Sequence, residues 1–292
     1  MLWIEVIRQL SAQLAEPFEL EFVVRGLGQS GRFKGIQTNK DRLTMDKLTW
    51  LNLMREPIGD EDIESLTEIV QQLKKQVPPQ YIVGWAEFCD LQFKVDERVL
   101  IPRQETEELV RLILENKDSI TSEMTDKPVR VLDIGTGSGA IAISLAKKHP
   151  DWQVSASDLS LDALELAREN AKLNDVNIDF FQSDVFDKIE GRFDLIVSNP
   201  PYIDWADQNE VDDSVRAYEP DSALYADHKG YAIYEKIAQE GRDYLTQNGQ
   251  IYLEIGYKQG ENVKALLEAN FPEKEVRIHQ DFFGKDRMIN VR

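Results

Sequence analysis

Residues 129–145 read VRVLDIGTGSGAIAISL, an apolar strand that runs into a glycine-rich turn and then into an apolar helix. A glycine turn between a buried strand and a helix lets the backbone approach a nucleotide-like ligand without side chains in the way. We therefore predict that the turn binds a cofactor, through Gly135, Thr136, Gly137, Ser138 and Gly139.

Strands and helices alternate after this turn, which predicts an α/β fold whose largely parallel sheet is covered on both faces. The expected strands are VRVLDI, WQVSASD, IDFFQSD, FDLIVS and QIYLEIG, followed by two more in EVRIHQDFFGKDRMINVR around a turn at Gly284-Lys285. The expected helices between them are Ala140 to Lys148, Leu161 to Asn174 and Gly230 to Tyr244.

The first 84 residues predict a separate small helical domain that helps to recognise a partner. Its helices are expected in LWIEVIRQL, MDKLTWLNLM and DEDIESLTEIVQQLKKQ, the last with Asp60 as its N-cap. Residues 85–102 alternate like a strand and then turn, which indicates a β-hairpin linker. Residues 103–292 form the expected catalytic domain, which starts with a helix at 104–116.

Composition excludes several classes of function. The 292 residues suffice for one sizeable core and a smaller domain, and Cys89 is the only cysteine, which excludes an intrachain disulfide and a thiolate metal cluster. Glu5, Arg8 and Glu16 interrupt the apolar start, so we expect neither a signal peptide nor a membrane span, and a cytoplasmic setting. The net charge of -19 disfavours nucleic acid as a partner.

Two kinds of cofactor site compete for the glycine turn. Gly135, Gly137 and Ala140 satisfy the dinucleotide pattern G-x-G-x-x-G/A, and Asp158 follows about 20 residues later, where a ribose-binding acid is expected. Asp133 helps to separate the two, because methyltransferases with a Rossmann-like fold carry an acid two residues before the first glycine. The D-x-G-x-G-x-G spacing therefore favours the methyltransferase form.

Acids that end the next two strands complete the predicted cofactor site. Asp158 can accept both vicinal ribose hydroxyls, provided that Ser160 and not Asp158 caps the following helix. Asp184 is placed to accept a hydrogen bond from an adenine amino group, with Val185 beside the base.

The strand FDLIVS opens into Asn199-Pro200-Pro201-Tyr202, the strongest functional signal in the chain. Prolines have no N–H, so this turn offers carbonyl acceptors without competing donors. Asn199 and Pro200 can each accept one hydrogen of a planar NH₂ group, and Tyr202 supplies an aromatic surface for it. A glutamine amide and the amino groups of adenine and guanine all fit this motif.

Eight segments of the chain resemble the HemK/PrmC family, the protein-glutamine methyltransferases of class I peptide chain release factors. They are PPQYIVG, LIPRQETEELV, VLDIGTGSGAIAISLA, SDLSLDALELARENA, FDLIVSNPPYI, EPDSALYA, LEIGYKQ and GKDRMI. The likeness is close over about residues 78–292. Within it, LIPRQETEELV and EP-x-x-AL distinguish this family from nucleic-acid enzymes that share the N-P-P-Y motif. Gln104 stands where the family usually has proline, and Val185 where members often have tryptophan.

The resemblance implies a seven-stranded Rossmann-like domain that uses S-adenosyl-L-methionine to methylate the glutamine of a Gly-Gly-Gln motif in class I release factors. It implies cofactor contacts from the Gly135–Gly139 turn, Asp158, Asp184, Val185 and Asn199, and a substrate glutamine held by Asn199, Pro200, Pro201 and Tyr202.

The alternatives from other classes explain less of the sequence. An amino methyltransferase for nucleic acid needs a basic groove, for which the acidic chain offers little material. A dinucleotide-dependent oxidoreductase, or a ligand-binding module without catalysis, leaves Asn199–Tyr202 with no task. Arg103 is expected either to orient the hairpin or contact substrate, or to pair with Glu105 or Glu107. The acidic loop DWADQNEVDD is either a solvated lid edge or an attractor for a basic substrate loop.

Overall fold

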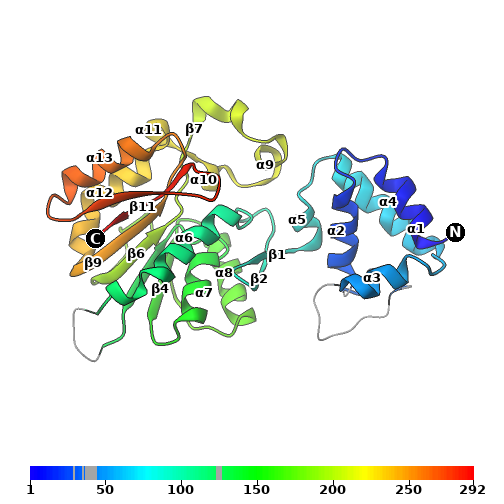
Figure 1. The fold of residues 1–292 in the computed structure, drawn as a ribbon, viewed down its shortest axis with the longest axis horizontal. Coiled ribbons are helices and arrows are strands. Elements are labelled where there is room, and N and C mark those ends of the chain that lie inside the picture. Colours follow the sequence, from blue (N-terminus) through cyan, green and yellow to red (C-terminus); the bar gives the residue numbers. More distant parts are fainter. Residues whose placement is uncertain (29, 35, 37–44, 123–126) are drawn as a thin grey trace. The chain divides into compact units, whose positions relative to one another are not determined.

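A seven-stranded sheet organises the larger of two units in the computed structural model, which describes residues 1–28, 30–34, 36, 45–122 and 127–292 (Figure 1). The strand order is β10-β11-β9-β6-β3-β4-β5. Neighbours from β9 to β5 are parallel, whereas β11 pairs antiparallel with both β9 and β10. The predicted class of fold, a mostly parallel seven-stranded sheet, is therefore confirmed. Its strands are β3 Arg130–Ile134, β4 Gln153–Asp158, β5 Asp179–Gln182, β6 Phe193–Ser198, β9 Leu245–Glu254, β10 Val276–Gln280 and β11 Asp286–Val291.

Helices cover both faces of this sheet, because each face carries its own apolar cluster. The first cluster holds Leu109 and Ile113 of α6 with Ile143 and Leu145 of α7. The second holds Tyr234 and Ile237 of α12 with Val263 and Leu267 of α13. The helices concerned are α6 Gln104–Glu115, α7 Ala140–Lys148, α8 Leu161–Leu173, α12 Ala232–Tyr244 and α13 Gly260–Asn270.

A two-stranded hairpin precedes α6, as predicted for this stretch. Its strands are β1 Trp85–Phe88 and β2 Leu91–Lys94. Cys89 and Asp90 join them with φ of 50° and 64°, the pair of positive angles that a two-residue type I′ turn demands. Phe88 and Phe93 pack edge to face, with ring centroids 6.0 Å apart, in the first apolar cluster.

The smaller unit comprises Met1–Trp85 together with Asp213–Tyr218, and the larger comprises Ala86–Asp212 and Glu219–Arg292. The small unit is helical, as predicted, with buried Trp3, Leu20, Leu66 and Ile69 in its core. Among the described residues, none of the helices has both the length and the apolar character needed to cross a membrane. The helices of this unit are α1 Trp3–Ser11, α2 Phe18–Leu27, α3 Lys47–Leu53, α4 Asp60–Lys74, α5 Pro79–Val83 and α9 Asp213–Tyr218.

Several details differ from the sequence predictions. Asp60 is not the N-cap of α4: that position is Gly59, whose extended backbone precedes the helix, and Asp60 begins the first turn. Helices α2 and α13 were not predicted, although Leu20, Val23, Val24 and Leu27 recur at helical spacing in α2. Strand β9 starts at Leu245, five residues before the predicted start, because it pairs with Phe193 across a register shift.

Short elements fill the stretch between β6 and α12. They are β7 Ile203–Asp204, η2 Trp205–Glu210, α10 Asp221–Leu224, β8 Tyr225–Ala226 and α11 Asp227–Gly230. Strands β7 and β8 pair in parallel as a separate two-stranded sheet. This stretch follows the Asn199–Tyr202 turn and returns beside it.

Candidate active site

The glycine turn has the backbone that its sequence predicts. Gly135, Gly137 and Gly139 have φ of 69°, 55° and 83°, all in the left-handed region. A Cβ built on Gly137 would meet nothing within 4 Å, whereas one on Gly139 would lie 2.7 Å from Ile143 Cδ1. Gly137 therefore leaves open space at the turn, and Gly139 allows α7 to start close against its neighbours.

Asp133 lies behind the turn and holds it in place. Its Oδ2 accepts hydrogen bonds from the Thr136 hydroxyl at 2.6 Å and from the Ala142 N–H at 3.2 Å. The side chain is fully buried, and burial raises the pKa of Asp133 to about 7, against these hydrogen bonds. The acid two residues before the first glycine thus fixes the turn to the first turn of α7.

Asp158 ends β4 and faces the same turn. Its Oδ2 accepts a hydrogen bond from the Gly137 N–H and its Oδ1 accepts one from the Ser160 N–H, both at 2.9 Å. Ser160 is the N-cap of α8, as predicted, and accepts from the Ala163 N–H at 3.2 Å. Burial raises the pKa of Asp158, opposed by the backbone N–H donors. Each carboxylate oxygen keeps a further lone pair for a ligand hydroxyl.

Asp184 and Val185 follow β5 and reach the same site. Asp184 Oδ2 lies 2.6 Å from the ammonium nitrogen of Lys236 on α12, a partner that sequence reasoning missed. Val185 is buried with φ of 53°, an unusual conformation for a β-branched residue. Backbone of this kind stores about 1–3 kcal/mol and concentrates at functional sites.

The Asn199–Tyr202 turn begins where β6 ends, next to the glycine turn at the end of β3, because β3 and β6 are parallel neighbours. The Asn199 amide nitrogen donates to the Thr106 hydroxyl at 2.9 Å. Thr106 in turn donates to Glu254 Oε2 at 2.7 Å. Burial raises the pKa of Glu254 to about 7, against hydrogen bonds from Thr106 and Tyr202 and the charge of Arg287.

The aromatic ring of Tyr202 lies apart from the other side chains of the turn. It packs against the second apolar cluster, and burial together with the Glu254 charge raises the pKa of its phenol. Its carbonyl accepts a hydrogen bond from Gln259 Nε2 at 3.0 Å. Tyr202 is not among the residues that line the cavity described next, so its role as an aromatic surface for substrate stays a prediction.

One cavity of about 240 Å³ brings most of the predicted residues together. This volume lies just below the usual range of small-molecule sites, which begins at about 300 Å³. Gly139 and Tyr202 are absent from its lining. The predicted residues that line it are Gly135, Thr136, Gly137, Ser138, Asp158, Asp184, Val185, Asn199, Pro200 and Pro201. Residues that the sequence did not indicate also line it, among them Arg98, Leu100, Pro102, Thr106, Leu159 and Ile233.

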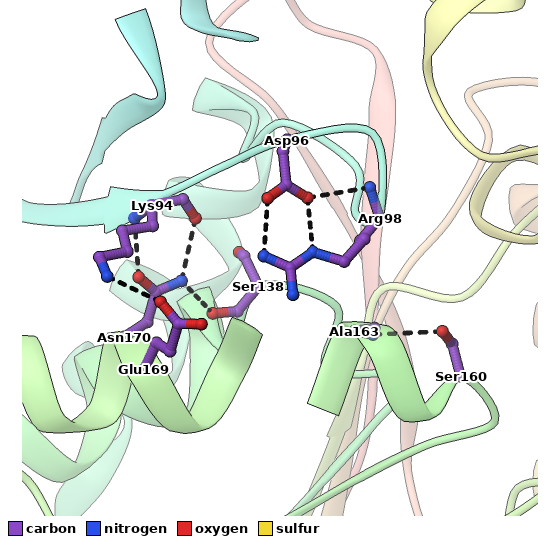
Figure 2. A network of polar contacts seen from close by, with 8 residues as sticks. All are labelled: Lys94, Asp96, Arg98, Ser138, Ser160, Ala163, Glu169 and Asn170. Atoms are coloured by element: carbon purple, nitrogen blue, oxygen red, sulfur yellow. Dashed lines mark hydrogen bonds and ion pairs between the residues drawn. The ribbon is translucent and has the colours of Figure 1, made fainter. Parts of the chain in front are cut away.

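The two arginines of the cavity are held by acids. The Arg98 guanidinium donates two hydrogen bonds to Asp96, at 2.7 and 2.8 Å, and the Arg98 N–H donates a third at 3.1 Å (Figure 2). Arg103 pairs with buried Glu219 at 2.5 Å, so the expectation of Glu105 or Glu107 as its partner is wrong. Glu219 also accepts from the Ile101 N–H at 3.0 Å. Glu219 therefore joins the segment EPDSAL to LIPRQETE, 118 residues earlier in the chain.

Asn170 of α8 ties the hairpin to the glycine turn (Figure 2). Its side-chain nitrogen donates to the carbonyls of Ser138 and Lys94, at 2.9 and 3.0 Å. Its oxygen accepts from the Lys94 N–H at 2.7 Å. Glu169 pairs with the Lys94 ammonium at 2.7 Å. The amide of Asn170 is fully buried, and its bond to Ser138 lies away from water, whereas its two bonds to Lys94 are partly buried.

Two family models match parts of the chain. A family model described as the methyltransferase small domain matches residues 116–216, and one described as the PrmC N-terminal domain matches residues 40–84. The first of these spans the glycine turn, Asp158 and the Asn199–Tyr202 turn.

Curated relatives match most or all of the chain. A release factor glutamine methyltransferase from Lactococcus lactis subsp. lactis is 57% identical over 294 residues, which cover 100% of both chains. One from Streptococcus pneumoniae is 46% identical over 96% of this chain and 97% of its own. One from Enterococcus faecalis is 41% identical over 85% and 87%, respectively.

Proposed function

Because this chain belongs to the family of release factor glutamine methyltransferases, we propose that it methylates class I peptide chain release factors. The acceptor is the side-chain amide nitrogen of the glutamine in their Gly-Gly-Gln motif, and the donor is S-adenosyl-L-methionine. One observation carries the proposal: Asn199, Pro200 and Pro201 line the same cavity as the glycine turn and Asp158. A planar amide and an adenosyl ligand therefore meet in one place.

The residues present fit the donor. Gly137 leaves room for ribose, since no atom lies within 4 Å of where its Cβ would be, and Asp158 offers carboxylate lone pairs beside it. Asp184 and Val185 line the cavity where the base would lie. When bound, S-adenosyl-L-methionine supplies a methyl group on a positively charged sulfur. Gly135, Thr136, Ser138 and Asn199 complete the proposed contacts.

The turn orients the acceptor for an in-line displacement. The amide nitrogen is a weak nucleophile because its lone pair is delocalised into the carbonyl. Asn199 Oδ1 and the Pro200 carbonyl each accept one N–H of the glutamine NH₂, which directs the face of the nitrogen to the methyl group and stabilises its growing positive charge. The nitrogen–methyl bond forms as the sulfur–methyl bond breaks, and the methylated nitrogen then releases one proton to solvent.

Membership of this family also suggests a role for each part of the protein. Residues 1–84 act as a substrate-recognition domain, residues 85–102 as a hairpin linker and residues 103–292 as the catalytic domain. The match of the PrmC N-terminal domain to residues 40–84 supports the first boundary. The reaction takes place in the cytoplasm, where release factors act, with no membrane involved. The net charge of -19 argues against nucleic acid as the acceptor.

The test offers radiolabelled S-adenosyl-L-methionine with separate pools of release factor, DNA and ribosomal RNA. We expect label only in the release factor, at its Gly-Gly-Gln glutamine by mass spectrometry. Asn199→Ala should lower kcat by about 100-fold, in the range for one lost oriented acceptor, and change donor affinity by only a few-fold. Asn270→Ala, on α13, is the matched control and should behave like wild type. Label in nucleic acid alone would overturn the proposal in favour of an amino methyltransferase for adenine or guanine.

A further inference from the structure

A hydrogen-bonded chain of three polar side chains ends at the reactive turn. Asn199 Nδ2 donates to Thr106 Oγ1 at 2.9 Å, and Thr106 Oγ1 donates to Glu254 Oε2 at 2.7 Å. The three residues come from the end of β6, the first turn of α6 and the end of β9. Thr106 and Glu254 are 5% and 2% exposed, so the bond between them is shielded from water, whereas Asn199 is partly buried.

The chemistry of these groups fixes which atom donates in each of the two hydrogen bonds. Above its pKa of about 7, Glu254 is ionised and only accepts hydrogen bonds, so the single proton of the Thr106 hydroxyl then points to Glu254. The hydroxyl oxygen is then left as an acceptor, and among the two ends of the Asn199 amide only the nitrogen can donate to it. Because the amide is planar, Asn199 Oδ1 is turned away from Thr106. Thr106 itself lines the cavity, as does Asn199.

The position of Thr106 is itself fixed by a buried acid. Arg103 is the N-cap of α6, three residues before Thr106. Glu219 accepts from both the Arg103 side chain and the Ile101 N–H, at 2.5 and 3.0 Å. These bonds hold the start of α6, and therefore the Thr106 hydroxyl, against the end of the sheet.

We propose that Thr106 is a positioning residue for methyl transfer: by holding the Asn199 amide nitrogen, it presents Asn199 Oδ1 to the NH₂ group of the substrate. This inference rests on the proposed function and adds a residue to it. Without the Thr106 hydroxyl, the Asn199 amide can rotate by half a turn. It then presents its own NH₂ group to the NH₂ group of the substrate glutamine, and two hydrogen-bond donors face each other. Glu254 acts one step further back, by fixing the direction of the Thr106 proton.

The test compares Thr106→Val, which keeps the shape and removes the hydroxyl, with Thr106→Ser, which keeps the hydroxyl. Assays at pH 8 keep Glu254 largely ionised. We expect Thr106→Val to lower kcat by about 10- to 100-fold, as small misplacements of a catalytic group do. The KM for release factor and the affinity for S-adenosyl-L-methionine should change less than about threefold. Thr106→Ser should keep at least about half of the wild-type kcat.

Thr246→Val is the matched control, because it also removes a buried hydroxyl that donates to a carboxylate, Asp194, at 2.9 Å. It lies outside the cavity lining. Its melting temperature should fall about as far as that of Thr106→Val, while its kcat stays at the wild-type value. Equal loss of kcat in both valine variants, or none in Thr106→Val, would refute the positioning role.

Two measurements separate this inference from the proposed function. In single-turnover assays, adding Thr106→Val to the Asn199→Ala variant should lower the rate of methyl transfer by less than about twofold, because no amide remains to be oriented. In the wild-type protein, NMR of the Asn199 side-chain NH₂ should show one proton strongly protected from solvent exchange, a readout that needs no methylation. Two freely exchanging protons would refute the inference even in an active enzyme. Absence of release factor methylation by the wild type would instead refute the proposed function.

Discussion

Two glycines of one turn have different physical reasons to be glycine. Gly137 has φ of 55° and opens onto the cavity, with no atom within 4 Å of a built Cβ. Gly139 has φ of 83°, and a built Cβ would lie 2.7 Å from Ile143 Cδ1 and 3.3 Å from Ala167 Cβ. The first glycine therefore leaves room for a ligand, and the second leaves room for the protein's own helices.

Alanine substitutions should separate these two reasons. Gly137→Ala should cost about 1 kcal/mol of unfolding free energy, the cost of a left-handed alanine, but lower the affinity for S-adenosyl-L-methionine at least about tenfold because the methyl group enters the cavity. Gly139→Ala should cost about 2–4 kcal/mol, since crowding adds to the backbone term. Denaturant titration and calorimetric binding measure both. A Gly137→Ala variant that binds the donor like wild type would contradict the assigned site.

At the level of single residues, the sequence predicted where site residues lie along the strands better than which residues they pair with. Asp158 ends β4 and Asn199 directly follows β6, as expected, whereas Asp184 lies two residues beyond Gln182, the last residue of β5. The ion pair between Asp184 and Lys236 spans 52 residues, and nothing local indicates it. The same holds for Arg103, whose partner Glu219 is 116 residues away and not among its helical neighbours. A side chain pairs with whichever residue the fold brings close to it, and that residue can be far away in the sequence.

Helix α8 forms hydrogen bonds to both the hairpin and the glycine turn. Asn170 bonds to both Lys94 and Ser138, whereas Asn174 of the same region bonds to the Gln92 carbonyl and to Asn170. Asn174 therefore holds the hairpin without reaching the turn. The two asparagines form a natural pair for comparison.

Asn170→Ala should lower the free energy of unfolding by about 2–3 kcal/mol, because it leaves buried backbone groups unpaired. It should also weaken donor binding several-fold by loosening Ser138. Asn174→Ala should cost about 1 kcal/mol and leave donor affinity unchanged. Urea denaturation and calorimetry test both variants. Equal effects of the two on donor affinity would show that the Ser138 contact does not support the site.

Most elements could be predicted because their signals are local. Helix α7 has the predicted bounds, Ala140 and Lys148, and β6 the predicted Phe193 and Ser198. Both are defined by apolar runs between glycine, proline or polar breaks. The early start of β9 at Leu245 could not be predicted, since it depends on pairing with Phe193 across a register shift. Where a strand begins or ends depends on the strand that it pairs with, and not only on its own residues.

The charge of the whole molecule bears on how it meets its substrate. The chain carries -19, and Asp207 and Asp212 are exposed in the acidic segment after the reactive turn. We expected this segment to be either a solvated edge or an attractor for a basic loop of the release factor. Long-range attraction raises the rate of encounter and is screened by salt.

If attraction operates, kcat/KM should fall several-fold between about 50 and 300 mM salt, while kcat stays constant. Asp207→Asn combined with Asp212→Asn should reduce both kcat/KM and its salt dependence. The control, Asp179→Asn with Asp187→Asn, removes the same charge from exposed sites elsewhere and should change neither. Initial rates at low release factor concentration measure this. A salt-independent kcat/KM would leave the segment as a solvated edge.

The sequence by itself determined the class of fold, the glycine turn and the Asn199–Tyr202 turn. Each turn could be predicted because it lies in a continuous stretch where a buried apolar strand meets a tight turn. The order of parallel strands then brings their carboxyl ends to one edge. Only the tertiary structure decided that Thr106, 93 residues before Asn199 and 148 before Glu254, joins them in one hydrogen-bonded chain. Hydrogen bonds act over about 3 Å in space, so a residue's partners depend on which elements the fold packs together.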